Sequence, residues 1–276
     1  CWTLDIESPT APLRPGHRYA LLGGRMSTAH ETEGFQVFSL TTRDGRTRAE
    51  IVPELGGSVS SLHLPGHDGT PREILYRHPW FWSRHTDDLR GGIPLLFPIC
   101  GRLLQDGTPG RYHVHDQPYA LPIHGFACRL PWEVVDARVP DALKLRLTDS
   151  PATRAQYPFV FELHLNYTVA DAQLICQFTV HNPGSAPLPY YAGFHPYFAT
   201  PPPGEGKEQT RYQASPQQRH VYNSTFTDLV GTAPTPCFPL SVSDSGLNEM
   251  LLEIGAAGET RLTFPDGFAL VQKADP

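Results

Sequence analysis

Two histidines have surroundings that suit acid–base chemistry on a sugar. His124 lies in the segment PIHGFA and His195 in the segment GFHPYF, so both are flanked by apolar and aromatic residues. Imidazole titrates near neutral pH, so one histidine can act as a general acid and the other as a hydrogen-bond donor. Aromatic faces stack on sugar rings while fixed donors bind the hydroxyls. The simpler interpretation is that each histidine satisfies a hydrogen bond in the core.

Two arginines flank the apolar, glycine-rich segment RGGIPLLFPICGRL at residues 90–103. Arg90 opens this segment and Arg102 lies near its end. A guanidinium group at the edge of a glycine-rich turn can donate two parallel hydrogen bonds to a sugar oxygen or to a phosphate. The alternative for each arginine is an ion pair on the surface.

A third histidine motif, HVH at residues 113–115, could suggest a metal site. His113 and His115 share one face of a strand, but no third ligand lies nearby in the sequence, which favours two surface histidines on a hairpin. The sequence also lacks GxGxxG, GxxxxGK[ST], HExxH and GxSxG. The absence of these motifs disfavours phosphoryl transfer from nucleotides, zinc proteolysis and serine hydrolysis. We expect neither a metal nor a cofactor.

Composition narrows the class of protein further. The chain of 276 residues has a formal net charge of −6. We therefore expect no nucleic-acid partner, because binding the phosphate backbone of DNA or RNA requires an excess of basic residues. No apolar stretch approaches the roughly 18 residues that span a bilayer, so we expect no membrane partner. The five cysteines are widely spaced and form no CxxC motif. We interpret them as buried, reduced thiols in a cytoplasmic protein.

The elements that must position these side chains are predicted to be short antiparallel strands. In the segment ALKLRLTD, leucines alternate with polar residues, which is the period of a half-buried strand. Proline- and glycine-rich turns separate such runs and disfavour long helices. The 200–220 segment is interpreted as a solvated loop. The predicted strands span residues 35–42, 47–53, 57–64, 132–139, 142–149, 159–169, 173–182, 251–254, 260–264 and 268–273, and they indicate an all-β sandwich or large barrel.

Residues 1–25 are expected to be an N-terminal extension that is not part of the fold. They are rich in proline, contain no apolar signal-peptide core, and precede Met26, which resembles a natural start. The alternative is a mature lipoprotein that begins at Cys1. We expect residues 26–276 to form a single domain.

Four of these segments, taken in order, resemble the aldose 1-epimerase (galactose mutarotase) family. They are RGGIPLLFPICGRL, GRYHVHDQPYALPIHGFA, YPFVFELHLNYTV and YYAGFHPYF. The similarity spans residues 34–276 and is strongest to the branch that resembles hexose-6-phosphate mutarotases. It implies a large antiparallel β-sandwich, the galactose mutarotase-like supersandwich. It also implies an isomerase that interconverts the α and β anomers of an aldose or aldose 6-phosphate without a cofactor or metal.

The resemblance also assigns roles to the candidate residues. His195 corresponds to the acid that protonates the ring oxygen, and His124 to a second histidine that binds a substrate oxygen. Arg102 corresponds to the sugar-binding arginine, and Arg90 to an arginine that contacts the 6-phosphate. Arg129 is a second candidate for phosphate binding, although Cys128 stands where that branch has its arginine.

Two departures from the family pattern bear on activity. Asn248 stands where the family has a sugar-binding aspartate, although an amide can still accept and donate hydrogen bonds. The family's base is a glutamate on a C-terminal strand, and we expect both to lie beyond Pro276 in a longer chain. The alternative is a homologue that lacks this base, with only weak substitutes at Glu249, Glu253 and Asp228. The alternative function is therefore a non-catalytic sugar-binding protein on the same fold.

Overall fold

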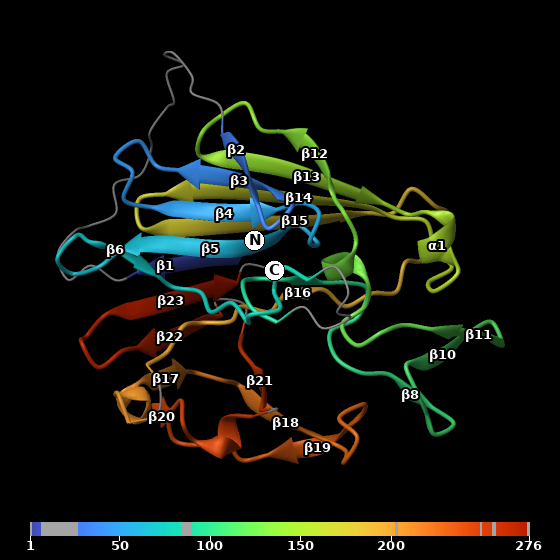
Figure 1. Cartoon of the computed structure of the whole chain (residues 1–276). Helices are drawn as coiled ribbons and strands as arrows, with labels where there is room; N and C mark the ends of the chain where they lie inside the picture. Colours follow the sequence, from blue (N-terminus) through green and yellow to red (C-terminus); the bar gives the residue numbers. More distant parts are fainter. Residues whose placement is uncertain are drawn as a thin grey trace.

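The protein is built from two stacked antiparallel β-sheets (Figure 1). The computed structural model describes residues 27–83, 90–201, 204–248, 250–255 and 258–274, and the backbone of residues 2–6. The smaller sheet contains, in order, β2 (Thr28–Thr32), β3 (Phe35–Thr41), β4 (Arg48–Val52), β5 (Ser58–Pro65) and β6 (Pro71–Glu73).

The larger sheet has nine strands and carries most of the second layer. Its order is β12 (Glu133–Asp136), β13 (Ala142–Thr148), β14 (Glu162–Ala170), β15 (Gln173–His181), β1 (Trp2–Ile6), β23 (Ala269–Ala274), β22 (Glu259–Thr263), β17 (Arg211–Ala214) and β20 (Leu240–Ser241). Each predicted strand is found within a few residues of its predicted ends. The prediction of an all-β sandwich is confirmed.

The core lies between the two sheets, because each strand turns alternate side chains inward. In β14, Leu163, Leu165 and Tyr167 are fully buried, and the residues between them are only partly buried. The Tyr167 hydroxyl donates a hydrogen bond of 2.7 Å to the Gly57 carbonyl, just before β5 in the other sheet. That buried hydrogen bond ties the layers together and satisfies a hydroxyl whose burial would otherwise be costly.

The N-terminal strand β1 corrects the expectation that residues 1–25 lie outside the fold. Its backbone pairs antiparallel with β15 on one side and with β23 on the other. β23 therefore has a neighbour on both sides, β1 and β22, and the sheet has no open position beside it for a further strand. The sequence did not reveal β1, because five residues before a proline-rich stretch carry a weak pattern and both partner strands are remote in sequence. The rest of the extension, residues 7–26, lies outside the described residues.

The prediction of a solvated loop at residues 200–220 was wrong. β17 pairs with β20 and β22 inside the nine-stranded sheet. β18 (Gln218–Tyr222) pairs with β19 (Leu229–Ala233) and β21 (Leu251–Glu253) in a separate three-stranded sheet. The sequence did not predict these strands because they are short and mostly only partly buried, and because prolines and charged residues surround them.

Several short elements complete the fold, and none of them is a long helix. α1 (Pro151–Arg154) is a single turn. Two hairpins, β8 (Leu104–Gln105) with β9 (Thr108–Pro109) and β10 (Arg111–Val114) with β11 (Gln117–Ala120), project from the sandwich (Figure 1). Within the described ranges, no helix has the length and apolar character needed to cross a membrane.

Candidate active site

The two predicted histidines lie side by side, with ring centroids 5.5 Å apart. His195 follows β16 (Gly193–Phe194), which pairs with β7 (Leu95–Leu96), and its backbone N–H donates to the Pro94 carbonyl at 3.0 Å. The segment that carries His195 is therefore held against residues about 100 positions earlier in the chain. The histidine pair that the sequence suggested is brought together by non-local pairing.

His124 occupies a tight turn with left-handed backbone geometry. Its φ is +66°, and that of Gly125 is +71°. A Cβ atom on Gly125 would lie 2.2 Å from the Phe97 carbonyl oxygen, so only glycine fits there. The Phe126 N–H donates to this same carbonyl at 3.0 Å. The HGF sequence thus allows the chain to press against Phe97 while it presents the His124 ring.

The hydrogen bonds of His124 define its tautomer. The Gly101 N–H donates to Nδ1 of His124 at 3.1 Å, and the His124 N–H donates to the Gly101 carbonyl at 2.9 Å. Because Nδ1 accepts a hydrogen bond, the neutral ring carries its proton on Nε2. His124 is therefore suited to donate a hydrogen bond from Nε2.

His195 has different surroundings. Its ring stacks on Tyr197 at a centroid distance of 4.7 Å. Among the described residues, its Nδ1 atom is buried and has no hydrogen-bond partner. A buried nitrogen in this state favours a ligand or water as its partner. Of the two histidines, His195 is thus the one whose ring is not tied to the backbone at Nδ1.

Arg90, Arg102, Arg129 and Asn248 were also expected to line the site, and the structure places them at different distances along the chain from the two histidines. Arg102 is next to Gly101, and its guanidinium carbon lies 5.6 Å from the Phe226 ring centroid. Arg90 is exposed and directly precedes two glycines, Gly91 and Gly92. The Gly92 carbonyl accepts a hydrogen bond of 2.9 Å from the Tyr197 N–H.

Arg129 and Asn248 differ most from expectation. Nη1 of Arg129 donates to the Ile123 carbonyl at 3.1 Å and to the Gly125 carbonyl. Asn248 is exposed at the end of a 3₁₀ turn, and its N–H donates to the Ser245 carbonyl at 3.2 Å. In the part of the chain that the structure describes, no hydrogen bond or ring contact joins Asn248 to the histidines.

The carboxylates named as substitute bases have other partners. The Asp228 carboxylate accepts hydrogen bonds from the Asn223 amide at 3.0 Å and from the Thr227 hydroxyl at 2.8 Å. Glu253 pairs with His220 across β18 and β21 at 3.0 Å. Glu249 lies outside the described residues. The structure thus gives Asp228 and Glu253 local structural roles.

Thiol chemistry is disfavoured near the histidines. Burial raises the pKa of the Cys100 thiol to about 11, so it is protonated at neutral pH even though the residue as a whole is exposed. Burial also raises the pKa of Cys128. Cys100 and Cys237 are exposed, so the expectation that all the cysteines are buried was wrong for these two. His113 and His115 are exposed on the β10–β11 hairpin, as predicted.

Phe226 was missed by sequence reasoning. It lies in the β18–β19 turn with φ of +56°, which is unusual for an aromatic residue. Hydrogen bonds among Asn223, Thr227 and Asp228 hold this turn. Its polar sequence gave no sign that the ring lies over Arg102.

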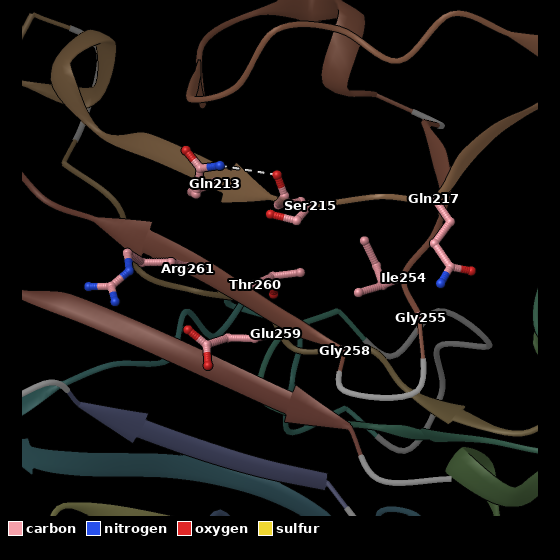
Figure 2. Close-up of a pocket in the computed structure, with 10 residues that line it drawn as sticks. Gln213, Ser215, Gln217, Ile254, Gly255, Gly258, Glu259, Thr260 and Arg261 are labelled. Atoms are coloured by element: carbon pink, nitrogen blue, oxygen red, sulfur yellow. Dashed lines mark hydrogen bonds between the residues drawn. The ribbon is translucent and has the colours of Figure 1, made fainter.

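A separate polar cleft of about 350 Å³ lies along β17 and β22 (Figure 2). The side-chain amide of Gln213 donates a hydrogen bond of 3.1 Å to the Ala214 carbonyl, so the Gln213 side chain lies along the strand. Neither His124 nor His195 lines this cleft. The lining residues are Gln213, Ala214, Ser215, Gln217, Ile254, Gly255, Gly258, Glu259, Thr260 and Arg261.

Solved structures share this architecture. A galactose mutarotase related enzyme from Lactobacillus acidophilus has a TM-score of 0.69 and 22% identity, with 86% of this chain and 84% of that chain covered. A galactose mutarotase-like protein from Lactobacillus casei has a TM-score of 0.66 and 20% identity, covering 86% and 87%. The fold is therefore the galactose mutarotase-like β-sandwich.

The sequence comparison identifies the family. The family profile described as aldose 1-epimerase matches residues 38–237, and the chain belongs to this family. The chromosomally encoded protein LacX of Lactococcus lactis subsp. lactis is 27% identical over 152 residues, which cover 53% of this chain and 46% of LacX. The chain thus spans about half the length of the curated relatives it matches.

Proposed function

We propose that the protein interconverts the α and β anomers of an aldose or an aldose 6-phosphate. The observation that carries this proposal is the pair of adjacent histidines with different hydrogen-bonding states. His195 donates a proton to the ring oxygen, while Nε2 of His124 donates a hydrogen bond to a substrate oxygen. A base removes the proton of the C1 hydroxyl, the ring opens, and rotation about C1–C2 precedes closure to either anomer. Arg102 binds sugar oxygens beside His124.

The activity is tested by polarimetry of freshly dissolved α-D-glucose and α-D-glucose 6-phosphate at pH 7. The expected result is mutarotation above the buffer rate for at least one of the two sugars. Calorimetric binding of these sugars without any rate increase would favour the sugar-binding alternative. That alternative draws support from Asn248, which is exposed and bonded within its own turn.

The choice between neutral and phosphorylated sugars depends on Arg90 in this proposal. Hydrogen bonds to a charged group contribute about 1.5–3 kcal/mol, so Arg90→Ala is expected to raise KM for glucose 6-phosphate by about tenfold or more. KM for glucose is expected to change little, since in this proposal the phosphate is the part of the substrate that the guanidinium binds. Equal changes in KM for both sugars would indicate a structural role for Arg90.

The proposal includes a cytoplasmic location. The cysteines at positions 100, 128, 176 and 237 are free thiols, which supports a reducing, cytoplasmic environment.

A further inference from the structure

The strained turn that carries His124 is bracketed by a single guanidinium group. His124 and Gly125 both have left-handed φ values, +66° and +71°. A histidine persists in this region only where its surroundings hold it there. The two carbonyl groups on either side of His124 belong to Ile123 and Gly125, and both accept hydrogen bonds from Nη1 of Arg129.

Arg129 is itself firmly anchored. It ends a 3₁₀ turn over Ala127–Arg129, and its N–H donates to the Phe126 carbonyl at 2.9 Å. The Ala127 carbonyl accepts a buried hydrogen bond of 3.0 Å from Nε1 of Trp132, and the Ala127 N–H donates to the Phe97 carbonyl at 3.2 Å. The guanidinium therefore extends from a fixed backbone toward the His124 turn.

We propose that Arg129 is a positioning residue for His124. By holding the carbonyls of Ile123 and Gly125, it fixes the turn in the geometry in which the Gly101 N–H reaches Nδ1 of His124. That hydrogen bond keeps the ring proton on Nε2, so Arg129 sets the direction of the donor that faces the substrate. This role replaces the direct phosphate contact that the sequence suggested for Arg129, and its kinetic consequence rests on the proposed function.

The chemistry of the side chain explains why an arginine suits this task. A guanidinium has five N–H donors in a rigid plane, so it can hold two carbonyl groups in a fixed relation. A lysine ammonium is a flexible point charge and holds the same groups less rigidly. A neutral glutamine has only two N–H donors on a shorter chain.

The test is the tautomer of His124, measured by long-range ¹H–¹⁵N NMR of the imidazole nitrogens. Signals of His124 are assigned by their loss in His124→Gln. In the unmodified chain we expect the Nε2-protonated tautomer with Nδ1 as acceptor. Arg129→Gln is expected to give a mixture of tautomers or protonation states, and Arg129→Lys an intermediate result. Arg138→Ala is the control, since Arg138 is exposed and pairs only with Asp136 at 2.7 Å in the part of the chain that the structure describes.

Activity supplies a second readout. Arg129→Gln is expected to lower kcat by about tenfold or more with a smaller change in KM, for neutral and phosphorylated sugars alike. An unchanged His124 tautomer in Arg129→Gln, or a KM increase confined to glucose 6-phosphate, would overturn the proposal. If Arg129→Gln does not fold, Arg129→Lys decides by the same NMR criterion. If no variant and no unmodified chain epimerises sugars, the proposed function fails while the tautomer still tests the role of Arg129.

Discussion

Replacing His195 by alanine is expected to lower kcat for mutarotation by about 10²- to 10⁴-fold, because a positioned general acid contributes that much to proton transfer. KM is expected to change little, since a proton donor acts mainly in the transition state. Among the described residues, the buried Nδ1 atom of His195 has no hydrogen-bond partner, and its ring stacks on Tyr197 and lies beside the His124 ring. Polarimetry of α-D-glucose and its 6-phosphate measures the effect.

A matched control is available on the surface. His113 is exposed on the β10–β11 hairpin, so His113→Ala is expected to keep the unmodified rate. His124→Gln retains an N–H donor and is expected to lose less activity than His195→Gln, which retains no acid. A His195→Ala variant with the unmodified rate would remove His195 from the mechanism.

Much of the fold was predictable because its information is local. In β13 and β14, buried leucines alternate with partly exposed or exposed residues, and this period alone defines a half-buried strand. β1 and β17 were missed for the opposite reason. Their short sequences carry little pattern, and their place depends on strands far away in the chain, which local alternation cannot reveal.

The site divides in the same way. The aromatic surroundings of His124 and His195 are local, and they correctly marked two residues that lie together. The contact of Phe226 with Arg102 joins positions more than 100 residues apart, and it was not predictable. Arg129 shows a further limit, because its residue type suggested an anion, and the sequence gave no sign that Nη1 also donates to the backbone carbonyls of Ile123 and Gly125. Residue type indicates which chemistry is possible, and only geometry selects among the partners.

Removing residues 1–25 is expected to destabilise the protein strongly, because β1 is an interior strand of the nine-stranded sheet. Its residues pair with Cys176 through Gln173 on one side and with Ala274 through Leu270 on the other. Each backbone hydrogen bond contributes about 1 kcal/mol net, so a strand with two neighbours contributes several kcal/mol. At about 2–4 °C per kcal/mol for a domain of this size, we expect Tm to fall by about 10 °C or more. Thermal unfolding followed by circular dichroism measures this change.

The effect must be separated from a general effect of shortening the chain. Leu4→Pro in the full chain removes a backbone donor within β1 and is expected to lower Tm substantially, because an interior strand does not tolerate proline. Ala29→Pro is the matched control in β2, an edge strand that pairs only with β3 in the described sheet. Its Tm is expected to change less, since one side of an edge strand has no partner. A synthetic peptide of residues 1–25 is expected to restore part of the Tm of the shortened chain. If the shortened chain instead keeps the Tm of the full chain, β1 does not contribute to the sheet, and residues 1–25 are the dispensable extension that the sequence suggested.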